Sequence, residues 1–237
     1  MRVGIILQAR MGSTRLPGKV LKQLAEKPML WHIIDRLKKV KRSDELIVAT
    51  SENINDREVV ELVRNCGISY FIGSEKDVLD RYYQAAKELQ LEHIVRATAD
   101  NPLVDPEEAD KLIDLHLTTT ADYSSNTSQV NSGLPMGIGV EVFSFAALEK
   151  SWIEGKNEDH REHVDEYILQ NPAIFNIQVL QAPGNKRAPQ LSLTVDTETD
   201  LRLMRDIYHR FYKPGHIVLV SQVIKHLAGV AQDSGKR

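Results

Sequence analysis

Short apolar runs alternate with helix-period patterns through the first half of the chain. Runs typical of buried strands begin at Val3 and recur at residues 45–50, 69–73 and 93–100. Amphipathic helical patterns lie between them at 29–40, 55–67 and 77–90, and a further helix is expected to start near Asp105. This repeating strand–helix order predicts an α/β fold, a doubly wound and mostly parallel sheet between two helical layers.

The pattern changes near Thr118. Residues 118–137 are polar, rich in Ser, Thr and Asn, and show little periodicity. A loop of this length inside a compact domain is more often functional than idle. Beyond it the pattern predicts strands at 139–145, 175–182 and 191–196, and helices at 160–171, 200–212 and 220–230. We therefore expect one domain over residues 1–237.

Composition narrows the class of protein. The 237 residues are 42% hydrophobic and 27% charged, with a net charge of −3, so no global basic field favours nucleic acid as a partner. No window approaches the ~18 apolar residues of a membrane span, and the first residues do not resemble a signal peptide. The single cysteine, Cys66, excludes an intramolecular disulfide, and we interpret it as an inert thiol. A cytoplasmic protein is expected.

Several cations follow the first predicted strand. Arg10, Arg15 and Lys19 stand in a short stretch with Gly12 and Ser13. A buried strand that runs into a glycine-containing loop with cations is typical of a polyphosphate site in an α/β sheet. The alternative is a plain first strand followed by a basic surface turn.

Two carboxylates also follow predicted strands. Asp100 ends the fourth strand, and Asp196 ends the run 191–196. Ligands of an open parallel sheet sit outside the carboxyl ends of the strands, and Mg²⁺ prefers carboxylate and phosphate oxygens. The pair beside the cationic loop therefore indicates a Mg²⁺–nucleotide site. Taken singly, Asp100 could cap the turn at Asn101–Pro102 and Asp196 could cap the next helix.

Known phosphate motifs do not fit the cationic loop. Gly12 and Gly18 enclose five residues where the Walker A motif has four, and Val20 replaces its Ser or Thr. The dinucleotide fingerprint G-x-G-x-x-G is absent. An ATPase and a dehydrogenase are thus disfavoured, and His160 with His163 is better explained by a solvated helix face than by a metal pair.

Five segments carry a family resemblance. They are Gln8–Lys19, G-x-x-x-D-V-L-x-R-Y-Y at Gly73–Tyr83, R-x-T-x-D-N-P-L at Arg96–Leu103, E-H-V at Glu162–Val164 and T-V-D-T at Thr194–Thr197. Together they resemble the cytidylyltransferases that make CMP-activated acidic sugars, such as the 3-deoxy-manno-octulosonate enzymes. The likeness is greatest to the branch named after spore coat polysaccharide biosynthesis protein F, and it covers nearly the whole chain.

The resemblance implies a nucleotide-diphospho-sugar transferase-like fold and assigns roles by position. The implied nucleotide-binding residues are Ala9, Arg10, Gly12, Ser13, Arg15, Lys19, Ser74, Asp77 and Arg81. The implied catalytic residues are Arg10, Lys19 and Asp100, and the implied Mg²⁺ ligands are Asp100 and Asp196. The residues expected towards the acceptor sugar are Arg96, Glu141 and His163.

The implied activity is a Mg²⁺-dependent transfer of CMP from CTP to a hydroxyl of an acidic sugar, with release of pyrophosphate, for surface polysaccharide biosynthesis. The resemblance also implies that residues 126–185 form an inserted sub-region, which builds a homodimer contact and part of the sugar pocket. One departure concerns the sugar, because Asn101 precedes Pro102 where the octulosonate enzymes have an acidic residue. Two alternatives stay open: a glycosyltransferase that consumes a nucleotide sugar, and a nucleotide-binding subunit without activity.

Overall fold

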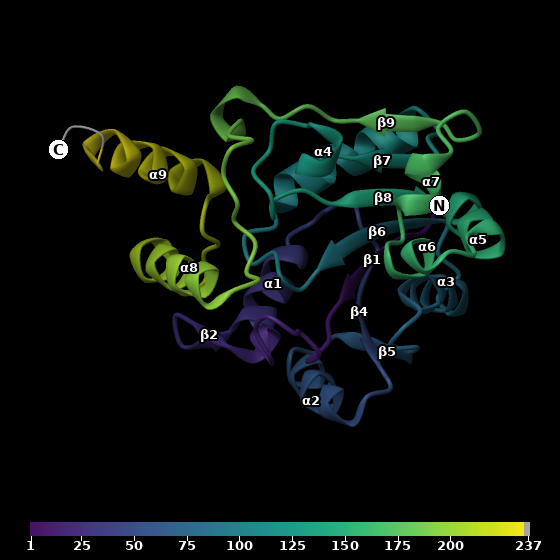
Figure 1. The fold of residues 1–237 in the computed structure, drawn as a ribbon, viewed down its shortest axis with the longest axis horizontal. Helices are drawn as coiled ribbons and strands as arrows, with labels where there is room; N and C mark the ends of the chain where they lie inside the picture. Colours follow the sequence, from purple (N-terminus) through teal and green to yellow (C-terminus); the bar gives the residue numbers. More distant parts are fainter. Residues whose placement is uncertain (235–237) are drawn as a thin grey trace.

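Seven strands form one sheet in the order β5-β4-β1-β6-β8-β7-β9 (Figure 1). The computed structural model describes residues 1–234. The strands are β1 (Val3–Gln8), β4 (Glu45–Ser51), β5 (Ser69–Gly73), β6 (His93–Thr98), β7 (Tyr123–Ser125), β8 (Glu141–Ser144) and β9 (Ile177–Val179). A separate two-stranded sheet pairs β2 (Gln23–Leu24) with β3 (Lys27–Pro28).

The sheet is mostly parallel, as the strand–helix alternation predicts. β1 lies between β4 and β6 and is parallel to both, and β5 extends this block beyond β4. β8 runs antiparallel to its neighbours β6 and β7, and β9 pairs parallel to β7. The carboxyl ends of β1, β4, β5 and β6 therefore meet at one edge of the sheet, where the cationic loop and Asp100 follow.

Helices cover both faces of the sheet and bury two apolar clusters. One cluster joins α1, α2, α4, α8 and α9 to Ile5 and Leu7 of β1, and the other joins α3, α5 and α7 to Ile6. Figure 1 shows α3, α5, α6 and α7 grouped together, with α8 and α9 far from them. The helices are α1 (Met29–Leu37), α2 (Arg57–Asn65), α3 (Val78–Glu88), α4 (Pro106–Thr118), α5 (Phe145–Glu154), α6 (Glu158–Glu162), α7 (Glu166–Gln170), α8 (Glu198–Phe211) and α9 (Val220–Ser234).

The structure differs from the sequence-based prediction at β8 and α5, and also at β7. The predicted strand 139–145 ends at Ser144, because the Ser144 hydroxyl accepts a hydrogen bond from the backbone N–H of Ala147 (3.1 Å) and so caps α5, which the pattern did not predict. β7 was also missed. Its three residues are fully buried within the polar stretch, where Ser124 and Ser125 carry no apolar strand signal.

The predicted helix 160–171 is broken. His163 is extended (φ −108°, ψ 105°) between α6 and α7, and Val164 packs into the core at this break. The predicted strand 191–196 is wrong as well, since the segment forms only an isolated bridge between Ser192 and Met136. A backbone hydrogen bond from Val195 N–H to the Asp100 carbonyl (2.8 Å) anchors its end. Residues 191–196, which we call the strap, are therefore an irregular segment that is not part of the sheet, although their apolar and polar residues alternate as in a strand.

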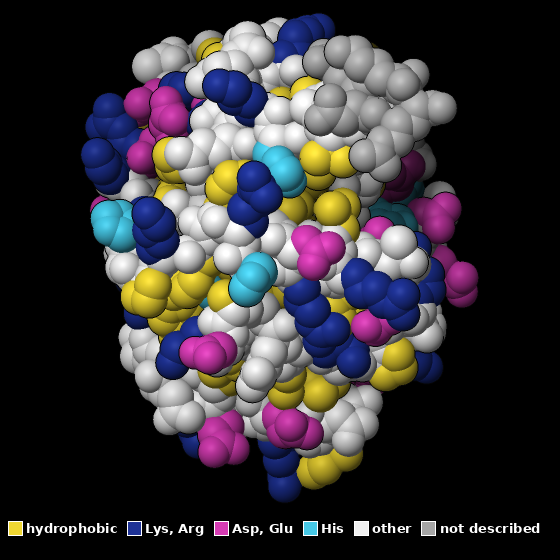
Figure 2. Space-filling model, turned by 90° about the vertical axis from the view of Figure 1, so that its left-hand side faces the viewer, with side chains coloured by type: hydrophobic (Ala, Val, Ile, Leu, Met, Phe, Trp, Pro, Cys, Tyr) yellow, Lys and Arg dark blue, Asp and Glu magenta, His cyan; other side chains and the backbone are white. Residues whose placement is uncertain are grey.

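Within the predicted sub-region 126–185, β8 and β9 belong to the central sheet. A dimer contact through this region stays a prediction. No helix within residues 1–234 has both the length and the hydropathy to cross a bilayer. The surface that carries α8 and α9 intersperses basic and acidic side chains and shows no continuous field of one sign (Figure 2).

Candidate active site

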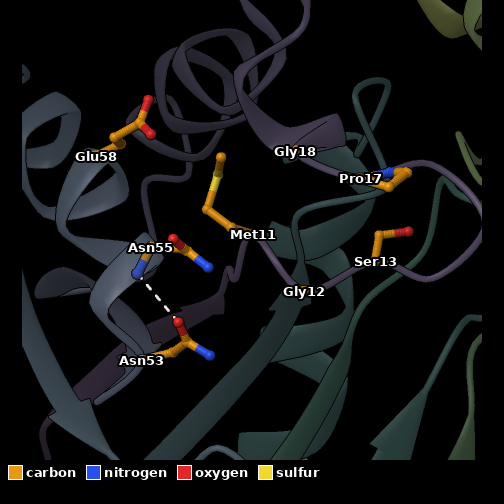
Figure 3. A pocket seen from close by; sticks show the side chains of 8 residues that line it. All are labelled: Met11, Gly12, Ser13, Pro17, Gly18, Asn53, Asn55 and Glu58. Carbon is orange, nitrogen blue, oxygen red and sulfur yellow. Dashed lines mark hydrogen bonds between the residues drawn. The ribbon is translucent and has the colours of Figure 1, made fainter.

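The loop after β1 is folded back on one backbone carbonyl. The Met11 carbonyl accepts hydrogen bonds from the N–H groups of Ser13 (2.8 Å) and Gly18 (3.1 Å). Gly18 has φ 65°, a left-handed conformation that glycine adopts without a Cβ clash. The buried Asp56 carboxylate accepts from the Met11 N–H (2.6 Å) and ties the loop to the end of β4. A cavity of about 330 Å³ lies on this side of the loop, with Asn53, Asn55 and Glu58 in its wall (Figure 3).

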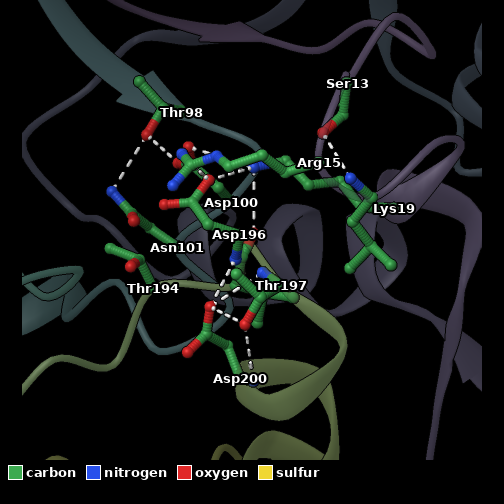
Figure 4. Close-up of polar contacts among 12 residues, drawn as sticks. Ser13, Arg15, Lys19, Thr98, Asp100, Asn101, Thr194, Asp196, Thr197 and Asp200 are labelled. Atoms are coloured by element: carbon green, nitrogen blue, oxygen red, sulfur yellow. Dashed lines mark hydrogen bonds and ion pairs between the residues drawn. The ribbon is translucent and has the colours of Figure 1, made fainter.

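Lys19 joins the loop to both predicted metal ligands (Figure 4). Its ammonium donates to the Val195 carbonyl (2.9 Å) and to Asp196 Oδ1 (2.9 Å), and it lies 3.4 Å from Asp100 Oδ2. The Arg15 guanidinium lies 3.0 Å from the same Asp196 oxygen. The structure therefore brings together three segments that are far apart in the sequence.

The alternative explanation for Asp196 does not hold. The hydroxyl of Thr197 caps α8, and the Asp200 carboxylate accepts from the Asp196 and Thr197 N–H groups to complete a capping box. The Asp196 carboxylate is thus free of the helix. Within residues 1–234, the Asp100 carboxylate accepts from the Thr98 hydroxyl (2.6 Å) and from Lys19, not from the turn after it.

The two carboxylates suit a divalent cation that also binds phosphate. Their side chains are 32% and 26% exposed for Asp100 and Asp196, so both reach the solvent. In the described part of the chain, no group of three or more His, Cys, Asp or Glu residues could hold a metal ion. Magnesium is commonly held by one or two carboxylates, substrate phosphates and water, so the donor set fits Mg²⁺ together with a nucleotide.

A cavity of about 460 Å³ opens over these groups. Its wall contains most of the residues predicted for the site: Ala9, Arg10, Gly12, Ser13, Arg15, Lys19, Asp100, His163 and Asp196. Gln8, Thr14, Thr98 and Glu162 also line it and were not predicted. The E-H-V motif contains Glu162, and strand-end placement could have indicated Gln8 and Thr98.

A third cavity, of about 610 Å³, shares Arg10 and Glu162 with the 460 Å³ cavity. Asp77 lies in its wall, caps α3 through the Asp80 N–H (2.8 Å) and pairs with the Arg161 guanidinium (Nε 2.8 Å). Arg161 could not be predicted from the sequence, because its placement depends on the position of α6.

Ser74 and Arg81 line neither the 460 Å³ nor the 610 Å³ cavity. Arg81 is 1% exposed, and its guanidinium donates to the Ser74 carbonyl. Burial lowers the pKa of Arg81. A Cβ at Gly73 would lie only 3.1 Å from Arg81 Cγ, so there is little room for a side chain at this position. The G-x-x-x-D-V-L-x-R motif therefore corresponds to a tightly packed turn that positions Asp77.

Arg96 and Glu141 form a buried charge cluster with Asp165. One Arg96 nitrogen contacts Glu141 Oε2 and lies 3.2 Å from Asp165 Oδ1, and the Tyr123 hydroxyl donates to Glu141 Oε1 (2.8 Å). Burial raises the pKa of Glu141 to about 7, although the attraction of Arg96 opposes the shift. Neither Arg96 nor Glu141 lines the 460 Å³ cavity. Asp165 follows the break at His163, so the cluster holds the segment that places His163 in the cavity wall.

Comparison with known families decides the class. The sequence model of the cytidylyltransferase family matches residues 4–224. The chain belongs to the cytidylyltransferase family. Among curated relatives, an uncharacterised protein of Methanocaldococcus jannaschii is 41% identical and covers 89% of this chain and 85% of its own length. The spore coat polysaccharide biosynthesis protein SpsF of Bacillus subtilis is 38% identical over 86% of this chain and 85% of its own length.

Solved structures agree on the fold. A cytidylyltransferase from Leptospira borgpetersenii is similar with a TM-score of 0.88 and 31% identity, over 97% of this chain and 96% of that one. A CMP-2-keto-3-deoxy-manno-octonic acid synthetase solved with CTP has a TM-score of 0.66 and 18% identity, over 89% and 99% of the two chains. A Mycobacterium tuberculosis protein solved with manganese has a TM-score of 0.59 and 16% identity, over 86% and 97%. The predicted family and fold are thus confirmed.

Proposed function

We propose that this cytidylyltransferase transfers CMP from CTP to a hydroxyl of an acidic sugar, with Mg²⁺, and releases pyrophosphate for surface polysaccharide biosynthesis. The observation that carries the proposal is the meeting of Lys19, Asp100 and Asp196 in the wall of one cavity. SpsF, by its name, supports the role in polysaccharide biosynthesis, and the synthetase solved with CTP supports CTP and an acidic sugar as substrates.

The cations of the loop would bind the triphosphate. Arg10, Arg15 and Lys19 surround the cavity, and the hydroxyl of Ser13 and the backbone near Gly12 add hydrogen-bonding groups. Fixed positive groups aimed at phosphate oxygens stabilise the charge that grows there when the bond to the leaving group breaks. The acceptor hydroxyl would form a bond to the α-phosphorus, and pyrophosphate would leave on the opposite side.

Asp100 and Asp196 would hold the metal ion. A bound Mg²⁺ supplies Lewis acidity at the phosphoryl oxygens and helps to orient them for displacement. The Thr98 hydroxyl, which donates to Asp100 Oδ1, fixes the orientation of that carboxylate. The manganese-bound structure of similar fold is consistent with a divalent ion, and the preference for Mg²⁺ is our proposal.

The two adjoining cavities suggest how the substrates divide the space. We assign the phosphates to the 460 Å³ cavity and the nucleotide base to the 610 Å³ cavity beside Asp77. Ser74 and Arg81 would position Asp77, because the Ser74 hydroxyl accepts from the Asp77 N–H (3.1 Å) and the Ser74 carbonyl accepts from Arg81. His163 is the predicted acceptor-side residue that lines the 460 Å³ cavity. Arg96 and Glu141 would affect the acceptor indirectly, because they hold Asp165 and with it the segment that places His163 in the cavity wall. A homodimer through residues 126–185 completes the proposal.

A pyrophosphate-release panel tests the proposal. Four nucleoside triphosphates are each combined with acidic and neutral sugars and Mg²⁺, and Asp196→Asn is compared with Glu61→Gln, a change of an exposed carboxylate on α2. We expect release only with CTP and an acidic sugar, unchanged in Glu61→Gln and nearly abolished in Asp196→Asn. Consumption of a nucleotide sugar without pyrophosphate would indicate a glycosyltransferase. Tight CTP binding with no turnover on any sugar would indicate a silent subunit.

A further inference from the structure

The ammonium of Lys19 is held by the same oxygens that the proposed metal would need. Three acceptors converge on its Nζ: Asp196 Oδ1 and the Val195 carbonyl at 2.9 Å, and Asp100 Oδ2 at 3.4 Å. The Lys19 side chain is only 11% exposed. The Lys19 ammonium is thus a nearly buried cation surrounded by three oxygen atoms.

The local charges already balance without a metal ion. Asp100 and Asp196 carry two negative charges, and Lys19 and Arg15 lie against them with two positive charges. Magnesium binds its oxygens at about 2.0–2.1 Å. A divalent ion that used these carboxylates would lie beside the ammonium, and the repulsion between them would weaken its binding.

To release both carboxylates, the Arg15 guanidinium, whose side chain is 65% exposed, and the side chain of Lys19 would have to move. Its backbone is fixed, because the Lys19 N–H donates to the Leu16 carbonyl (3.1 Å) and the Lys19 carbonyl accepts from Lys22 (3.1 Å). The side chain lines the 460 Å³ cavity, as do Arg10 and Ser13. A triphosphate in that cavity would offer the ammonium oxygens of higher charge than a carboxylate.

We infer that Lys19 is a displaceable internal cation, which keeps divalent metal off Asp100 and Asp196 until a nucleoside triphosphate draws its ammonium away. Metal and nucleotide then bind with positive cooperativity, and each tightens the other by the same factor. This inference rests on the proposed function, since it takes the two carboxylates as the metal ligands.

Binding of Mn²⁺ tests the inference without any turnover. Its affinity is measured by electron paramagnetic resonance, with and without CTP, for the wild type, Lys19→Met and Lys19→Arg. Lys41→Met is the matched control, since it removes the same charge at an exposed position outside the cavity. Without CTP, we expect Lys19→Met to bind Mn²⁺ at least about tenfold more tightly than the wild type. Lys19→Arg and Lys41→Met should resemble the wild type, and CTP should strengthen Mn²⁺ binding less in Lys19→Met.

Equal Mn²⁺ affinity of wild type and Lys19→Met without CTP would overturn the inference. Should Lys19→Met not fold, as judged by circular dichroism, the wild type alone decides, because CTP must raise its Mn²⁺ affinity and Mn²⁺ its CTP affinity by the same factor. If Mn²⁺ and CTP bind to the wild type independently of each other, the inference is contradicted. Failure of the proposed function is distinguishable, since it would appear as no pyrophosphate release with any sugar while the Mn²⁺ comparison still gives its result.

Discussion

Replacing Arg96 by Met removes the positive group that contacts two buried carboxylates. Glu141 and Asp165 have side chains only 5% and 3% exposed, and both contact the same guanidinium nitrogen. Removing one partner of a buried ion pair costs about 3–5 kcal/mol, because the remaining charge stays buried without compensation. For a domain of this size, that loss corresponds to a melting temperature lower by about 6–20 °C.

The loss should also depend on pH. The pKa of Glu141 is raised by burial to about 7 from an ordinary value of 4.5, so the folded state binds this proton more tightly than the unfolded state. The corresponding stability is complete below pH 4.5 and is lost as the pH rises through about 7. Without the opposing attraction of Arg96 that pKa rises further, so the destabilisation of Arg96→Met should be larger at pH 8 than at pH 5.

Urea unfolding at both pH values measures the effect. Arg2→Met is the matched control, because Arg2 pairs with Glu45 at the surface, with side chains 46% and 23% exposed, and such pairs contribute about 0–1 kcal/mol. Asp165→Asn should cost less than Arg96→Met, since Arg96 and Glu141 then remain as a single pair. The reasoning is refuted if Arg96→Met unfolds at the same urea concentration as Arg2→Met at pH 8.

Four further outcomes are expected. Asp100→Asn should lower the rate of pyrophosphate release by about 10²–10³ with an unchanged circular dichroism spectrum, and near-normal turnover would contradict its assignment as a metal ligand. Burial and the nearby His93 lower the pKa of His116 from 6.5 to about 4, so the stability that neutral His116 contributes is lost as the pH falls from 6.5 through 4. The melting temperature of His116→Gln should therefore depend less on pH over this range, and a pH dependence equal to that of the wild type would contradict this prediction. Gly137→Ala should destabilise the fold by more than about 1 kcal/mol in thermal melting, because Gly137 has φ 90° and a Cβ would lie 2.8 Å from the Leu193 carbonyl carbon; an unchanged melting temperature would contradict this. Light scattering should give twice the chain mass of 26.8 kDa, and a monomer mass would exclude the dimer.

The strand–helix alternation of residues 1–118 could be predicted because the central-sheet strands and the helices α1 to α4 each carry their own signal, whereas β2 and β3 were not predicted. Continuous apolar runs mark β1, β4 and β6, and helical spacing marks α1 to α3. The second half mixes signals. β7 is short and built around serines, α5 follows β8 without a break, and the strap before Asp196 alternates like a strand although it pairs with Met136 alone.

The site was predictable where a charged residue follows directly from a predicted strand. Arg10 and Asp100 belong to this kind, and their closeness follows from the parallel order of β1 and β6. Lys19 stands further along the loop that begins at the end of β1. Asp196 lies at the expected place, but it does not end a strand as predicted. It is placed there by the strap, whose Val195 N–H donates to the Asp100 carbonyl. Arg161 could not be foreseen, because it depends on where the helix 160–171 breaks, and that break is set by Val164 and Asp165 in the tertiary structure.

The fate of the phosphorus atoms of CTP tests the central claim most directly. CTP labelled with ³²P at the α- or the γ-position is incubated with Mg²⁺ and the sugar selected by the release panel, and the products are separated. We predict that the α-label appears in a CMP-sugar and the γ-label in pyrophosphate. An α-label found only as free CMP, or a γ-label transferred to the sugar, would contradict the proposed cytidylyl transfer.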